Sequence, residues 1–228
     1  MRSRIVASAL LALAAVIVVP HTGGVQAQSR NSAPPATDTS SNSDRPLVLA
    51  KQGSFFINEQ NIAAAFPTAT GTPVPGHISA KGMYVQYQIP DARNRGAYPV
   101  IMVHGSGHTG KTYEETPDGR IGWAEYFVRR GIPVYVVDHS GRARSGFDPG
   151  PSNRAKLEGN PALIPSFTEF TNEQAWTNFR FGPTAFTPYE NTRFPIKAQD
   201  QYFAQIVPNT ETSYLDVLVR HGAASGFN

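Results

Sequence analysis

The sequence predicts an α/β fold built around one βαβ unit. Two continuous apolar runs, residues 98–103 and 132–138, are typical of strands that are covered on both faces. Between them, residues 122–130 carry aromatic side chains at helical spacing, and Gly131 follows as a helix-ending residue. Strand, helix and strand in this order predict a parallel pair joined by a right-handed crossover.

Elements on either side of this unit are weaker. Residues 54–57 and 83–89 are expected to form two short strands, because they are rich in β-forming residues. Residues 149–210 are aromatic and repeatedly broken by proline, which is typical of a lid-like insertion. Within them, Thr171 and Gln174 have the spacing of a capping box that opens a short helix.

The N-terminus has the pattern of a secretory signal peptide. Arg2 and Arg4 precede an apolar run over residues 5–19, and small residues end at Ala27. A membrane anchor is the alternative, but the apolar run is shorter than the roughly 18 residues that a spanning helix needs. We therefore expect cleavage after Ala27 and a secreted or periplasmic protein, with no membrane contact afterwards.

The rest of the chain is expected to hold one domain. Residues 28–46 are mostly small and polar, as in a flexible linker, so the folded part should cover residues 47–228. The formal net charge is +3, and scattered charges do not favour nucleic acid as a partner. Without cysteine or a histidine pair at metal-ligand spacing, no metal site and no cofactor are expected. The oligomeric state is left open.

A glycine-rich loop after the first apolar run permits two interpretations. Residues 105–112 fit the phosphate-binding pattern G-x-x-x-x-G-K-[ST]. That loop works when a helix starts near Lys111 and aims its N-terminus at phosphate, whereas Pro117 leaves room for one turn at most. The same loop begins with His-Gly-x-Gly, as an oxyanion loop does after a strand.

The oxyanion interpretation assigns a role to each residue of the loop. Its donors must approach a substrate oxygen closely, and Gly105 and Gly107 carry no side chain that would block the approach. The backbone N–H groups of Ser106 and Gly107 are the expected donors. Gly105 supports the loop, and His104 is expected to pack beneath it as a structural histidine.

The chain resembles a group of secreted bacterial esterases in the α/β-hydrolase superfamily. The resemblance rests on residues 53–56 (GSFF), 84–90 (YVQYQIP), 98–148 (including VHGSGHTGK), 175–183 (AWTNFRFGP) and 193–202 (RFPIKAQDQY). It implies an α/β-hydrolase-type sheet, a small-molecule ester substrate and a Ser–acid–His triad whose serine lies in G-x-S-x-G. Relatives often carry two adjacent cysteines where this chain has Ser106 and Gly107.

The triad that the resemblance implies has no counterpart in the printed sequence, which contains no G-x-S-x-G. Asp138, His139 and Ser140 are consecutive, so their side chains point apart and cannot form a relay. No catalytic residue is therefore assigned. Residues 214–221 look like the helix before the nucleophile strand, so we expect the N-terminal part of an esterase, truncated before its nucleophile and inactive as given. The alternatives are a non-catalytic exported binding protein and, less favoured, a nucleotide-binding protein.

Export can be tested on secreted material. If the N-terminal pattern is a signal peptide, N-terminal sequencing of the exported protein should begin at Gln28. Membrane-bound protein that retains Met1 would contradict the prediction.

Overall fold

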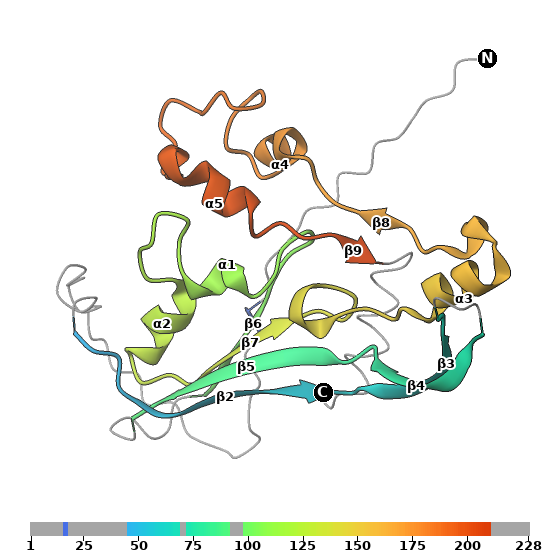
Figure 1. Cartoon of the computed structure of the whole chain (residues 1–228). Coiled ribbons are helices and arrows are strands. Elements are labelled where there is room, and N and C mark those ends of the chain that lie inside the picture. Colours follow the sequence, from blue (N-terminus) through green and yellow to red (C-terminus); the bar gives the residue numbers. More distant parts are fainter. Residues whose placement is uncertain (1–15, 18–44, 69–71, 92–97, 211–228) are drawn as a thin grey trace.

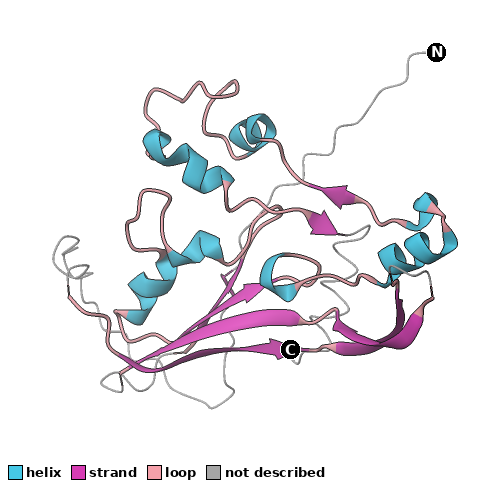
Figure 2. Cartoon of the chain, viewed as in Figure 1, coloured by secondary structure: helices cyan, strands magenta, loops and turns pink. Residues whose placement is uncertain are grey.

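The computed structural model describes residues 16–17, 45–68, 72–91 and 98–210. They form a mixed α/β fold with a central sheet, two short helices against it and a layer of small elements above these helices (Figures 1 and 2). The α/β class predicted from the sequence is confirmed.

Five strands make up the central sheet, in the order β1-β6-β7-β5-β2. Their bounds are Val16–Ile17 (β1), Val100–Val103 (β6), Val134–Asp138 (β7), Met83–Pro90 (β5) and Leu49–Ile57 (β2). Only β6 and β7 pair in parallel, while the other neighbours are antiparallel. The predicted parallel pair is thus confirmed, but it belongs to a mostly antiparallel sheet.

Alternation along β7 divides the core between the two faces of the sheet. Val134 and Val136 lie on the face covered by α2 (Trp123–Val128), where they pack with Met102 and Val128. Val137 points to the other face and packs with Met83 and Val85. These residues are almost completely buried, which explains why the sequence of β7 reads as a continuous apolar run.

The predicted elements recur with altered bounds. The helix over residues 122–130 is α2, and Gly131 after it has φ +80°, the left-handed conformation that glycine adopts easily. The strand expected at residues 54–57 is longer than predicted, because backbone pairing with β5 extends it back to Leu49. The strand over residues 83–89 ends one residue later, at Pro90.

The sequence did not predict the hairpin of β3 (Gln60–Phe66) and β4 (Val74–Ala80). These strands pair antiparallel with each other in a separate two-stranded sheet. Pro75 and Gly76 disfavour a strand locally, and β3 is rich in alanine, so residue preferences gave no signal. Pairing between the two segments supplies the missing stabilisation.

Residues 149–210, which we call the insertion, begin beside the hairpin of β3 and β4 and continue into the layer above α1 (Lys111–Glu114) and α2 (Figure 1). The structure bears out the predicted capping box of α4 with both reciprocal hydrogen bonds between Thr171 and Gln174. This helix, α4, spans Asn172–Asn178. The other elements of the insertion are α3 (Gly150–Glu158), β8 (Phe167–Thr168), α5 (Gln199–Phe203), β9 (Asn209–Thr210) and the 3-10 turns Pro161–Leu163 and Ile196–Ala198.

The insertion has a core of its own. Trp176 is 0% exposed and packs with Tyr202, Phe203 and Ile206, and several further aromatic rings surround this group. These aromatic residues therefore hold the segment together by packing against one another.

Three sequence predictions fall mainly outside the described residues: the signal peptide, the linker and the helix over residues 214–221. One described piece of the predicted signal peptide, β1, pairs with β6 through Val16 and Ile17. Cleavage after Ala27 would remove this short strand from the edge of the sheet. Among the described residues, no helix is long and apolar enough to cross a membrane.

Candidate functional site

The loop after β6 begins with a tight turn over residues 105–108. The N–H of His108 donates to the carbonyl of Gly105 at 3.3 Å, and Gly107 has φ +72°. Ser106 has a negative φ. A positive φ at the third position alone is the signature of a type II turn, which favours glycine there. The turn therefore explains Gly107 through its backbone conformation.

The two backbone donors expected from the sequence lie at the centre of this turn. Across the described part of the chain, no acceptor pairs with the N–H of Ser106 or of Gly107. Gly107 is nevertheless buried, and a buried N–H without an acceptor is uncommon in folded proteins. Both N–H groups are thus unpaired within the described part of the chain.

His104 lies beneath the loop. Its Nδ1 donates to the carbonyl of Gly105 at 2.8 Å, and its Nε2 accepts the backbone N–H of His139 at 3.1 Å. The two imidazole rings meet edge to face, with centroids 4.6 Å apart. These contacts connect the ends of β6 and β7 and leave both nitrogens of His104 engaged within the protein.

Burial shifts both histidines towards their neutral forms. The pKa of His104 falls from 6.5 to about 3, mainly because of burial and then because of the nearby His139. The pKa of His139 falls to about 4, again mainly through burial, with a further contribution from Arg142. Both rings are therefore neutral near pH 7, as the hydrogen bonds of His104 require.

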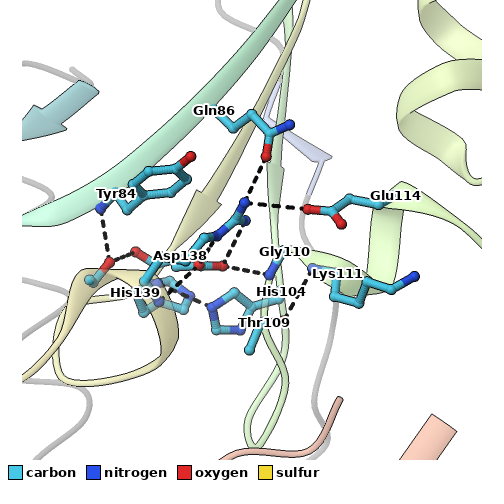
Figure 3. A network of polar contacts seen from close by, with 11 residues as sticks. Tyr84, Gln86, His104, Thr109, Gly110, Lys111, Glu114, Asp138 and His139 are labelled. Carbon is cyan, nitrogen blue, oxygen red and sulfur yellow. Dashed lines mark hydrogen bonds and ion pairs between the residues drawn. The ribbon is translucent and has the colours of Figure 1, made fainter. Parts of the chain in front are cut away.

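Asp138, at the end of β7, connects this loop to the rest of the sheet (Figure 3). Its side chain is 0% exposed, and Oδ1 accepts the backbone N–H of Gly110 at 2.6 Å. Oδ2 accepts the Nε–H of Arg144 at 2.6 Å. Arg144 extends the network to Gln86 at 2.6 Å and to Glu114 at 3.4 Å.

Burial raises the pKa of Asp138, but hydrogen bonds from Arg144 and Gly110 outweigh this effect, so the pKa lies below its ordinary value. The carboxylate is therefore ionised at neutral pH. It fixes the far end of the loop through Gly110, while His104 fixes the near end.

This network also bears on the phosphate-binding pattern. The N–H of Gly110 donates to Asp138, and the N–H of Lys111 donates to the Thr109 hydroxyl at 3.1 Å. The Lys111 ammonium pairs with Glu115 at 2.8 Å. The helix after the loop, α1 (Lys111–Glu114), is a single turn. The groups that would hold phosphate are thus engaged within the protein. A helix of one turn also has only a small dipole with which to attract phosphate.

A groove of about 440 Å³ lies between the loop and the insertion. Gly105 and His108 of the turn line one side of this groove. Its aromatic lining residues are Tyr113, Trp123, Phe179, Phe181, Phe194 and Tyr202. Such a groove suits an apolar group of small-molecule size next to the turn.

The turn following β7 contains no triad. Asp138, His139 and Ser140 are all buried, but the contacts of Asp138 are to Gly110 and Arg144. The serine that touches Asp138 is Ser145, whose hydroxyl donates to the Asp138 carbonyl at 2.6 Å. These contacts give Asp138 and Ser145 structural roles.

Three residues that shape the loop were not predicted from the sequence: His108, Arg144 and Tyr202. Tyr202 lies far from the loop in the sequence, so no local pattern could associate the two. Within the described ranges, no group of three or more His, Cys, Asp or Glu side chains could hold a metal ion.

The chain is similar to known hydrolases. A probable secreted lipase from Fungal sp. (strain ATCC 74256) is 41% identical over 104 residues, which are 46% of this chain and 28% of that protein. A solved structure described as a novel bacterial esterase matches with a TM-score of 0.71 and 37% identity. That match covers 79% of this chain and 57% of the esterase chain. No protein-family model matches the sequence.

The chain thus spans little more than half of the esterase and about a quarter of the lipase. Both relatives are hydrolases of the esterase and lipase type, and the mixed α/β fold is shared with the esterase.

The buried histidines predict a pH-dependent stability. Because their pKa values are lower in the folded state, the unfolded chain binds more protons below pH 6.5, and acid favours unfolding. The contribution of these histidines to the free energy of unfolding should therefore be fully present above pH 6.5 and should be lost as the pH falls towards about 4. Each such histidine contributes a slope of about 1.4 kcal/mol per pH unit. Urea unfolding followed across this range measures it.

His139→Gln should reduce this slope by about 1.4 kcal/mol per pH unit, which is the contribution of one proton, even if the substitution lowers the free energy of unfolding at every pH. His77→Gln is the matched control, since His77 is exposed on β4. A slope that is unchanged by His139→Gln would contradict the assignment.

Proposed function

We propose that this chain provides the substrate-binding part of a carboxylic-ester hydrolase of the α/β-hydrolase superfamily. The observation that carries the proposal is the turn at Ser106 and Gly107, whose two N–H groups have no acceptor among the described residues. The esterase and lipase relatives agree with it.

The chemistry follows from where charge develops during ester cleavage. Attack on an ester carbonyl converts its oxygen into an oxyanion, which backbone N–H donors at a fixed position stabilise. Ser106 and Gly107 are the proposed donors. Gly105 leaves the approach open, and His104 and Asp138 hold the loop from below without contacting substrate.

The groove beside the turn is the proposed site for the apolar part of the ester. Its aromatic lining has few polar groups, which favours an alkyl or aryl substituent over a charged one. The insertion supplies four of the six aromatic side chains in this lining, so we assign it the role of a lid over the site. Secretion, which the name of the fungal lipase states for that protein, is proposed here as well.

Hydrolysis also requires a nucleophile. The printed sequence has no G-x-S-x-G, so we propose that these 228 residues bind and polarise an ester but do not turn it over. Turnover should appear in a chimera that appends the part of the bacterial esterase that this chain does not match.

The donor role can be tested in that chimera with a p-nitrophenyl ester. Ser106→Pro removes one N–H, and proline is favoured at the second position of a type II turn, so the loop should keep its shape. We expect kcat to fall by about 10²–10³-fold. Ser106→Ala keeps the N–H and should retain kcat.

Equal kcat values for these two variants would contradict the donor role. A chimera that folds but does not hydrolyse any short ester would instead favour the alternative, an exported binding protein without catalysis. Turnover by the unextended chain would show that it carries an overlooked nucleophile.

Nucleotide binding is the other alternative, and the geometry does not favour it. Because Lys111 and Gly110 are engaged by Glu115 and Asp138, calorimetric titration with Mg-ATP should give no heat of binding. A magnesium-dependent signal that Lys111→Ala removes would overturn the hydrolase proposal.

A further inference from the structure

A buried pair of side chains connects the insertion to the turn at residues 105–108. The Nδ1 atom of His108 lies 2.9 Å from the carbonyl oxygen of Ser106, and its Nε2 lies 2.7 Å from the hydroxyl of Tyr202. Both side chains are buried, at 7% and 8% exposed. One imidazole therefore joins the turn to α5, which lies more than ninety residues further along the chain.

The partners determine where the protons are. A carbonyl oxygen can only accept, so Nδ1 of His108 must carry the hydrogen. In a neutral imidazole Nε2 is then an acceptor, and the Tyr202 hydroxyl must donate to it. Burial lowers the pKa of His108, which favours this neutral ring. Tyr202 thus selects the tautomer in which His108 can donate to Ser106.

The same hydrogen bond fixes the direction of a peptide plane. In a trans peptide the C=O and N–H groups point in opposite directions, so holding the Ser106 carbonyl also orients the N–H of Gly107. This peptide is the central one of the turn, and its reversal converts a type II turn into type I. Because Gly107 tolerates either sign of φ, the turn sequence leaves both orientations open.

We propose that His108 is a positioning residue that aims the Gly107 N–H at the substrate oxygen, and that Tyr202 of the insertion sets the imidazole tautomer that His108 needs. The inference rests on the proposed ester hydrolysis. It adds that the insertion, besides covering the groove, determines whether the oxyanion donor is correctly oriented.

Two further contacts from the insertion act on the same turn. The N–H of Val207 donates to the carbonyl of Gly107 at 3.1 Å, which holds the next peptide as well. Phe170 lies against Gly107, so closely that a Cβ atom at this position would be 2.8 Å from its ring. The turn is thus held from its far side by residues that reach it only when the insertion is folded over it.

Two substitutions of His108 separate the proposed bond from general packing. The amide nitrogen of an asparagine side chain can take the place of Nδ1, so His108→Asn should keep the bond to Ser106. The amide of His108→Gln lies near the place of Nε2, so it should keep contact with Tyr202 and lose Ser106. Tyr202→Phe keeps the ring but removes the hydroxyl, and Tyr189→Phe is the control at an exposed tyrosine of the insertion.

NMR of the labelled 228-residue chain gives a readout that does not depend on catalysis. Long-range nitrogen spectra should show the Nδ1–H tautomer of His108, and Tyr202→Phe should produce a mixture of tautomers. The carbonyl shift of Ser106 and the amide coupling of Gly107 should stay as in the parent in His108→Asn. Both should change in His108→Gln, whereas Tyr189→Phe should leave all of these signals unchanged.

Kinetics in the esterase chimera give the second readout. We expect His108→Gln to lower kcat by about 10²–10³-fold, the loss of one oxyanion donor, with KM little changed. His108→Asn should retain most of kcat, and Tyr202→Phe should lie between the two. A uniform loss in His108→Asn and His108→Gln would indicate a packing role and overturn the proposal.

The two readouts separate failure of this inference from failure of the proposed function. Unchanged Ser106 and Gly107 signals in His108→Gln would refute the positioning role, whatever the activity. A parent chimera that folds without hydrolysing esters, together with the expected NMR changes, would refute the hydrolase function while confirming that His108 orients the peptide.

Discussion

The buried carboxylate of Asp138 is the constraint on which the arrangement of the site depends. Removing a carboxylate from water costs several kcal/mol unless charge and hydrogen bonds compensate it. Here Arg144 and the N–H of Gly110 provide that compensation. Because one partner belongs to the loop after β6 and the other to the turn after β7, the need to satisfy one ionised group fixes both segments relative to each other and to the sheet.

A second constraint acts on the loop from the opposite side. The insertion contacts the turn at residues 105–108 through Phe170, Tyr202 and Val207, while His104 supports the turn from the sheet. Within the described part of the chain, the turn has one backbone hydrogen bond of its own, between His108 and Gly105. Its shape is therefore imposed by two layers that meet there. This is a physical basis for a site whose donors are oriented before substrate arrives.

Many features of the site could be predicted from local sequence. Glycines in a His-Gly-x-Gly sequence after an apolar strand predicted the loop that follows β6, and the spacing before Pro117 limited the helix at Lys111 to the single turn that is observed. His108 and Tyr202 could not be identified in this way. Nothing near His108 shows which of its nitrogens carries the proton, because the group that decides this is distant in the sequence.

The sequence by itself determined the βαβ unit, the helix capped by Thr171 and the position of the loop, because these depend on periodicity, caps and glycines within a few residues. Only the tertiary structure decided that the sheet is mostly antiparallel, that β3 and β4 form a hairpin, and that Asp138 accepts hydrogen bonds from Gly110 and Arg144. Those outcomes arise from pairings between distant segments, in which a hydrogen bond or a buried charge is satisfied by a group that the local sequence does not contain.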